Sequence, residues 1–135
     1  TIADLEVDFV GAERAAYEWP YRTALDAGAI VATGSDAPIT FPDWRQGVET
    51  MVLRKSKASG RVSGPEQRIT VMEALRTYTA APAWQDFDES WKGMLEEGKV
   101  ADLCVLRQDI LTIDPERLSK VSVLATYLGG RKVFG

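Results

Sequence analysis

The chain has 135 residues, 45% hydrophobic and 27% charged, with a formal net charge of −4. This length is enough for one domain with a sizeable core, and the composition is ordinary for a globular protein. The acidic balance disfavours nucleic acid and anionic membranes as partners, because both attract clustered Lys and Arg. No apolar stretch approaches the roughly 20 residues of a membrane span.

The numbers of cysteine and histidine residues limit the cellular compartments and the catalytic groups that we expect for this chain. The single cysteine, Cys104, cannot close an internal disulfide, which favours a reducing, cytoplasmic location. Its apolar neighbours predict a buried structural thiol. The chain has no histidine, so a serine nucleophile would lack its usual base. The sequence begins with Thr1 and shows no signal peptide, and we interpret it as processed or excised from a longer chain.

Five helices are predicted along the first two thirds of the chain, and no regular structure is predicted for residues 1–9. The helices cover residues 13–18, 21–27, 46–54, 70–79 and 82–87. Pro20 suits the first turn of the second helix, and Gly28 lies just past its end. Thr70 and Glu73 match a capping box at the start of the fourth helix.

A single strand is expected among these helices. The apolar run Ala29–Thr33 predicts a buried β-strand, and Gly34-Ser35-Asp36 follows it directly. A carboxylate at the C-terminal end of a strand lies where α/β barrels carry their catalytic groups. One such strand cannot form a sheet by itself, because its backbone groups need neighbours. Its partner strands are therefore expected outside this chain.

Strands dominate the last third of the sequence. We predict strands over residues 101–106, 121–128 and 131–134, with a connecting segment at 109–118. Gly129-Gly130 separates the last two strands and is typical of a tight hairpin.

Four segments, taken together, resemble the amidohydrolase superfamily, and most closely its amidohydrolase family 3 branch, which includes exoenzyme-regulatory-protein-like members. The segments are YRTALDAGAIVATGSDAPI (21–39), ITVMEALRTYTAAPA (69–83), KGMLEEGKVADLCVL (92–106) and VLATYLGGRKVFG (123–135). Their order and spacing carry the resemblance, which covers nearly the whole chain from about Gly11 onward.

The resemblance implies an α/β fold in two parts. Residues 1–89 would be the last strand and helices of a TIM-type (β/α)8 barrel. Residues 90–135 would be the C-terminal strands of a small composite β-sandwich. The barrel would be incomplete, because the resemblance covers only its final βα portion.

The same resemblance implies a metal-dependent hydrolase acting on non-peptide carbon–nitrogen bonds (amide, cyclic amide or amidine) of a small-molecule substrate. Asp36 matches the family position of a metal ligand and proton shuttle for a divalent cation, with zinc favoured. From the residues alone, the favoured interpretation is that Asp36 caps a turn or a helix. The resemblance reverses that preference for the complete enzyme. Catalytic zinc usually has three protein ligands, so we expect this chain alone to bind no zinc tightly and to hydrolyse nothing.

Two further residues are candidates for substrate binding. Trp44 lies in the segment that follows Asp36, where an aromatic ring could line a pocket. Arg54 lies where the resembled family tends to have an arginine. Two alternatives remain: Trp44 could pack in the core, and Arg54 could form a surface salt bridge.

A second interpretation makes the chain a non-catalytic self-associating or regulatory interaction module. An upstream reading frame with a His-x-His pair after an apolar strand would favour the enzyme instead. In either case the exposed strand edges predict a homo-oligomer.

Overall fold

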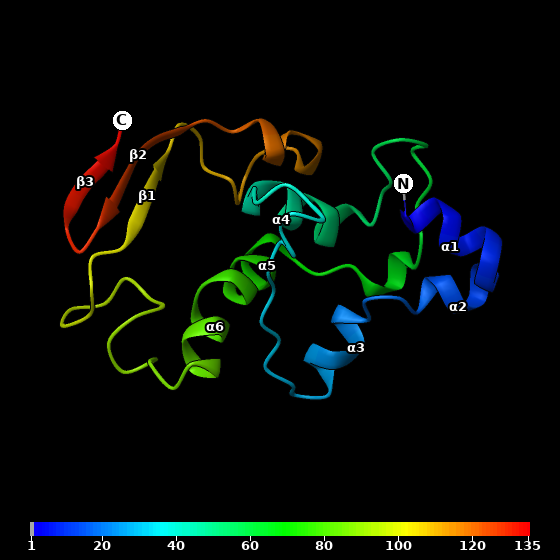
Figure 1. Cartoon of the computed structure of the whole chain (residues 1–135), viewed down its shortest axis with the longest axis horizontal. Coiled ribbons are helices and arrows are strands. Elements are labelled where there is room, and N and C mark those ends of the chain that lie inside the picture. The colour runs from blue at the N-terminus through cyan, green and yellow to red at the C-terminus, as the bar shows by residue number, and fades with distance from the viewer. Residues whose placement is uncertain (1) are drawn as a thin grey trace.

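The computed structural model describes residues 2–135 of the chain (Figure 1). Helices are α1 (Ile2–Val10), α2 (Ala12–Ala16), α3 (Tyr21–Asp26), α4 (Trp44–Leu53), α5 (Val71–Tyr78) and α6 (Ala80–Gln85). Short 3-10 helices are η1 (Pro65–Gln67) and η2 (Pro115–Lys120), and strands are β1 (Leu103–Leu106), β2 (Val123–Leu128) and β3 (Arg131–Phe134). Among these described residues, no helix is long and apolar enough to cross a membrane.

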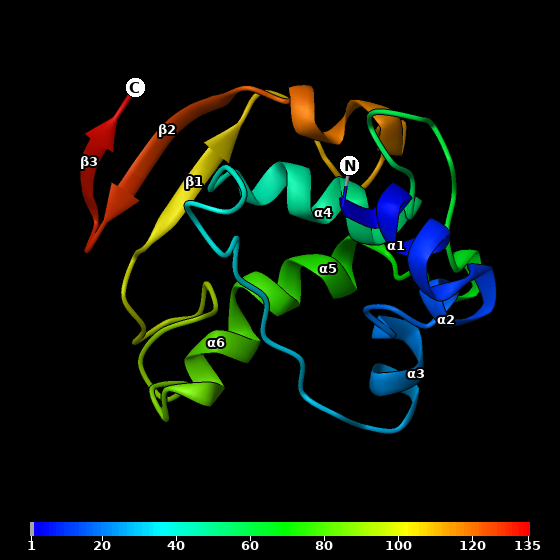
Figure 2. The same ribbon diagram turned by 45° about the vertical axis from the view of Figure 1, so that its right-hand side comes forward.

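The elements are laid out from a helical end to a sheet end. Figures 1 and 2 show α1 and α2 at one side, α4 and α5 in the middle, and the sheet with the C-terminus at the other side. The five predicted helices are confirmed, with ends shifted by a few residues.

The helix α1 was not predicted, because its sequence carries no clear periodic pattern. Polar contacts from a distant loop hold it: the Asp4 carboxylate accepts hydrogen bonds from the Ser56 and Ser59 hydroxyls. Arg61 lies 3.6 Å from the Asp8 carboxylate. Such contacts are set by the tertiary fold and leave no local sequence signal.

Two helix starts are fixed by side chains. The predicted capping box of α5 is confirmed, since the Thr70 hydroxyl accepts from the Glu73 N–H at 3.2 Å. In return, the Glu73 carboxylate accepts from the Thr70 N–H at 2.8 Å. At α4, the Asp43 carboxylate accepts from the Arg45 N–H at 3.0 Å.

The hydrophobic core lies where α4, α5 and η2 meet. Its buried members are Val48, Met51, Ile69, Ala74, Ile110, Leu118 and Val121. Burial of such side chains stabilises a fold by about 1.5–3 kcal/mol each. Three of these residues follow position 90, so the core draws on both sides of the expected division into residues 1–89 and 90–135. That division stays a prediction.

The sheet is antiparallel, in the order β1-β2-β3. Leu103 pairs with Tyr127, and Leu128 pairs with Arg131 across the predicted Gly129-Gly130 hairpin. The prediction that Cys104 is buried is wrong: the thiol is exposed on β1. An apolar run indicates burial only where other residues cover the strand. The described residues cover Ala125 of β2 and leave Cys104 exposed.

The strand predicted over Ala29–Thr33 is not formed within the described residues. In Figure 2 the segment between α3 and α4 is drawn as a coil that passes α5 and α6. A short tie holds it, from the Thr33 N–H to the Thr77 carbonyl at 2.9 Å. The α/β class holds through the helices and the three-stranded sheet, but a single strand without neighbours has no ladder to join. That residues 29–33 form a strand of a barrel remains a proposal.

Candidate functional site

Asp36 lies in a tight turn after the extended segment. Its backbone is left-handed (φ 56), a conformation that Asp tolerates better than most residues. The Asp36 carbonyl accepts from the Ile39 N–H at 2.8 Å, and the Ser35 hydroxyl accepts from the Ala37 N–H at 3.3 Å. The turn is thus closed by the Asp36 backbone and the Ser35 side chain. The Asp36 carboxylate is exposed and forms no hydrogen bond or ion pair with the described residues.

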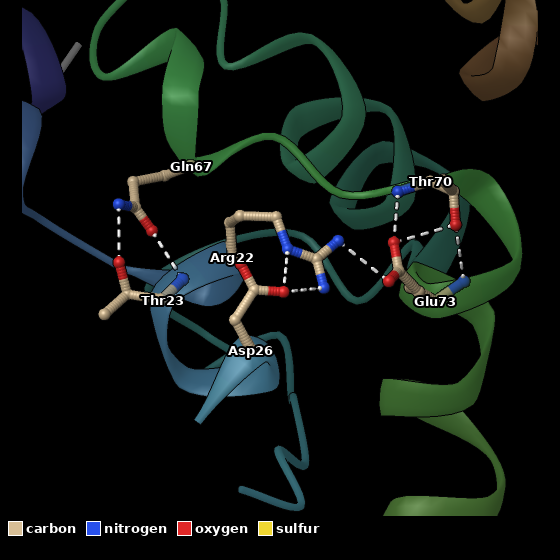
Figure 3. A network of polar contacts seen from close by, with 6 residues as sticks. All are labelled: Arg22, Thr23, Asp26, Gln67, Thr70 and Glu73. Atoms are coloured by element: carbon tan, nitrogen blue, oxygen red, sulfur yellow. Dashed lines mark hydrogen bonds and ion pairs between the residues drawn. The ribbon is translucent and has the colours of Figure 1, made fainter. Parts of the chain in front are cut away.

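An ion-pair network fixes the helix that leads to this turn (Figure 3). The Arg22 guanidinium of α3 lies 2.8 Å from Glu73 of α5 and 2.8 Å from Asp26 of its own helix. Hydrogen bonds from Thr70, then from Arg22, lower the pKa of Glu73. Glu73 therefore serves both the capping box and the link between α3 and α5.

A second link joins α3 to η1. The side-chain oxygen of Gln67 accepts from the Thr23 N–H at 3.0 Å, and its amide nitrogen donates to the Thr23 hydroxyl at 2.8 Å. Gln67 is only 4% exposed, so these two bonds satisfy a buried amide that would otherwise be costly. The two links hold α3, and with it the start of the segment that ends at Asp36.

The segment is held again at its far end. The Asp43 carboxylate binds the Arg45 guanidinium at 2.8 Å, and Arg45 also donates to the Val121 carbonyl at 2.6 Å. Hydrogen bonding from Arg45 lowers the pKa of Asp43. The start of α4 is thereby tied to the chain between η2 and β2. One buried polar group in the segment is unsatisfied: the Thr33 hydroxyl has no hydrogen-bond partner among the described residues.

The two predicted substrate-binding residues lie apart. Trp44 is the first residue of α4 and packs, half-buried, against the core. Arg54 ends the same helix, and ten residues of α-helix separate two positions by about 15 Å. The structure therefore places Trp44 near the end of the Asp36 loop and does not bring Arg54 to it.

Arg54 donates to backbone carbonyls of the N-terminal segment and of the loop before η1. Its guanidinium donates to the carbonyls of Ser63 at 3.0 Å, Trp19 at 3.1 Å and Glu18 at 2.7 Å. Burial lowers the pKa of the guanidinium. These bonds give Arg54 a structural task, and its contact with a substrate stays a prediction.

A pair of carboxyl groups beside Arg54 was missed by sequence reasoning. Burial, and then a hydrogen bond with Glu6, raise the pKa of Glu18 to about 7. One oxygen of Glu6 is buried without a partner among the described residues. Glu6 lies in α1 and Glu18 in the turn after α2, twelve positions later, so no spacing pattern could have paired them.

A complete metal centre does not fit the described residues. No three His, Cys, Asp or Glu side chains come together among them in a way that could hold a metal ion. Asp36 has the right chemistry for one oxygen ligand, and catalytic zinc usually has three protein ligands. The residues therefore fit one ligand position and not a centre.

Comparison with known proteins identifies the family. The family model described as "Amidohydrolase family" matches residues 2–134. The chain therefore belongs to the amidohydrolase family, as the four segments indicated.

Curated relatives agree with this assignment. A putative amidohydrolase, YtcJ of Bacillus subtilis, is 32% identical over 95% of this chain and 25% of its own length. An N-substituted formamide deformylase of Arthrobacter pascens is 32% identical over 96% of this chain and 27% of its own length. The protein LONG AFTER FAR-RED 3 of Arabidopsis thaliana is 31% identical over 98% of this chain and 23% of its own. The chain spans about a quarter of the length of these relatives.

A solved structure supports the fold. The crystal structure of an amidohydrolase from Thermotoga maritima superposes with a TM-score of 0.63 at 22% identity, covering 84% of this chain and 25% of that one.

Proposed function

We propose that this chain forms the C-terminal part of a metal-dependent hydrolase of non-peptide carbon–nitrogen bonds, with Asp36 as its contribution to the active site. The observation that carries the proposal is the Asp36 carboxylate, which is exposed and without a partner among the described residues. The family match supports the hydrolase class. An acid used only to stabilise its own turn would have its oxygens engaged there, and these are not.

The task proposed for Asp36 is to bind metal and to move a proton. A carboxylate beside an attacking water can take its proton and pass it to the leaving nitrogen. A divalent cation, when bound, lowers the pKa of water to about 7 and polarises a carbonyl. We favour zinc, whose remaining ligands would have to come from outside the described residues. For the same reason, we propose that the chain alone is inactive.

The family supports a broad class of substrate, namely compounds with non-peptide carbon–nitrogen bonds. The relative from Arthrobacter pascens is named for acting on N-substituted formamides, so such amides are reasonable first test substrates. Cyclic amides and amidines remain within the proposal. A cytoplasmic location, argued from the single cysteine, stays a prediction.

The test is a chimera in which this chain replaces the segment of the formamide deformylase that it matches, which is 27% of that protein's length. Asp36→Asn keeps a residue that tolerates the left-handed backbone and removes the proton acceptor. We expect the substitution to lower kcat/KM by about 10²–10⁴. The matched control is Glu97→Gln, an exposed acid outside the proposed site, which should leave kcat/KM unchanged.

Full activity of the Asp36→Asn chimera, with folding verified by circular dichroism, would contradict the role given to Asp36. The isolated chain gives a second check, by zinc titration in a tag-free preparation at neutral pH. We expect no tight binding, and micromolar or stronger affinity would show that the chain carries a complete zinc site.

A further inference from the structure

Hydrogen bonds within residues 35–40 hold the backbone on both sides of Asp36. The Asp36 carbonyl, which belongs to the peptide group after Asp36, accepts from the Ile39 N–H at 2.8 Å. The Ser35 carbonyl, which belongs to the peptide group before Asp36, accepts from the Thr40 hydroxyl. Both peptide groups that flank the Asp36 Cα are therefore held by partners a few residues away, without help from a neighbouring strand.

These two peptide groups set the direction in which the Asp36 side chain leaves the backbone. Each peptide group is planar, so the orientations of the two planes define φ and ψ at the Cα between them. With φ and ψ fixed, only the side-chain torsions can still turn the carboxylate. The φ of Asp36 is 56, in a left-handed region that few non-glycine residues occupy, so loss of either bond favours relaxation to another conformation.

Thr40 makes the one of these two bonds that depends on a side chain. The bond from Ile39 joins backbone groups, whereas the bond from Thr40 is lost when its hydroxyl is removed. Thr40 also lies next to Phe41, whose carbonyl accepts from the Asp43 N–H at 2.8 Å, and Asp43 caps α4. The hydroxyl therefore connects the backbone at Asp36 with the start of a helix that packs in the core.

We propose that Thr40 is a positioning residue for Asp36: its hydroxyl holds the peptide group between Ser35 and Asp36 and thereby aims the Asp36 carboxylate. This inference rests on the function proposed above, in which Asp36 binds metal and moves a proton. A catalytic group displaced by about 1 Å can lose a factor of about 10² in rate, so a single hydroxyl behind the carboxylate affects turnover. In this role Thr40 acts through Asp36 and touches neither metal nor substrate.

The test compares three substitutions of threonine. Thr40→Val removes the hydroxyl and keeps the branched shape, and Thr40→Ser keeps a hydroxyl that can donate. The matched control is Thr50→Val, because Thr50 is also exposed and its hydroxyl donates to the Gln46 carbonyl at 2.8 Å, away from the turn. Kinetics are measured in the chimera with the formamide deformylase. Amide exchange of Ile39 is measured by NMR in the chain itself, with urea unfolding as the check on folding.

We expect Thr40→Val to lower kcat about ten-fold and to leave KM nearly unchanged, because the reacting step depends on the placement of Asp36. Thr40→Ser should recover most of this loss, and Thr50→Val should keep the parental kcat. In the Asp36→Asn background, Thr40→Val should lower kcat no further, since the two residues act as one unit. Exchange of the Ile39 amide should accelerate about five-fold in Thr40→Val and in neither other variant, at equal urea midpoints.

The positioning role and the proposed function fail in different experiments. Full activity of Asp36→Asn contradicts the function and removes the positioning role with it. A parental kcat in Thr40→Val, when Asp36→Asn has lost activity, overturns the role of Thr40 alone. The same holds if the loss persists in the Asp36→Asn background, because the hydroxyl then does not act through Asp36. Unchanged exchange of Ile39 in Thr40→Val, or no recovery in Thr40→Ser, also overturns the positioning role.

Discussion

The junction of α4, α5 and η2 is closed by this chain, whereas the segment from Ile30 to Asp36 is not. At the junction, Val48 and Leu118 are almost fully buried, and side chains from distant parts of the sequence fill the space between elements. Along the segment, an equally apolar stretch finds neither a neighbouring strand nor a covering layer among the described residues. Stability is thus concentrated in the junction, while the proposed chemistry depends on the segment.

The largest expected effect comes from the closed region. Leu118→Ala removes a side chain that is 2% exposed and leaves a cavity between η2 and α4, at a cost of about 2–5 kcal/mol. Urea unfolding followed by circular dichroism measures the loss. The control, Leu128→Ala, truncates a side chain that is 61% exposed and should cost less than about 0.5 kcal/mol. Equal losses in the two variants would remove the contrast between the regions.

The second effect tests the link between the regions. Gln67→Ala leaves the Thr23 N–H and hydroxyl without their partner, which should cost about 1–3 kcal/mol. Because Thr23 lies in the helix that precedes the segment, hydrogen exchange of the bonded amides at residues 27–29 and at Thr33 should also accelerate.

Gln85→Ala, at the exposed end of α6, is the matched control for Gln67→Ala and should change neither quantity. If Gln67→Ala lowers the unfolding free energy but leaves exchange of the segment unchanged, the link does not hold the segment in place.

The same contrast explains which elements could be predicted from the sequence. The α5 capping box and the hairpin at Gly129-Gly130 depend on residues a few positions apart, and both were recognised. The strand at Ala29–Thr33 depends on partners that no local pattern supplies, and it is not formed. Burial of Cys104 failed for the same reason, because it requires other residues that cover the strand.

For the candidate site, the sequence could supply the acid but not its surroundings. Asp36 was singled out by its place after an apolar run. The link between Arg22 and Glu73 spans 51 positions, and no spacing rule connects residues that far apart. The capping box did identify Glu73, and only the structure reveals that its second oxygen binds another helix.

The smallest expected effect concerns the pH dependence of stability. The pKa of Glu18 is raised to about 7, so between its ordinary value of 4.5 and 7 the folded chain binds a proton that the unfolded chain has lost. Stability should therefore fall as pH rises through this window and level off above it. Because Glu18 is partly exposed to solvent, we expect the change in unfolding free energy to be about 1 kcal/mol.

Glu18→Gln holds the group neutral and should make the urea midpoint nearly constant between pH 5 and pH 8, within the window that the Glu18 pKa defines. Above pH 7 this variant should be more stable than the parent, since no second carboxylate then faces Glu6 beside the Arg54 guanidinium. Glu13→Gln changes an exposed acid of α2 and should keep the parental slope. If Glu18→Gln keeps the slope of stability against pH that the parent shows, the pH dependence belongs to another group. The closeness of Glu6 and Glu18 would then carry no electrostatic cost.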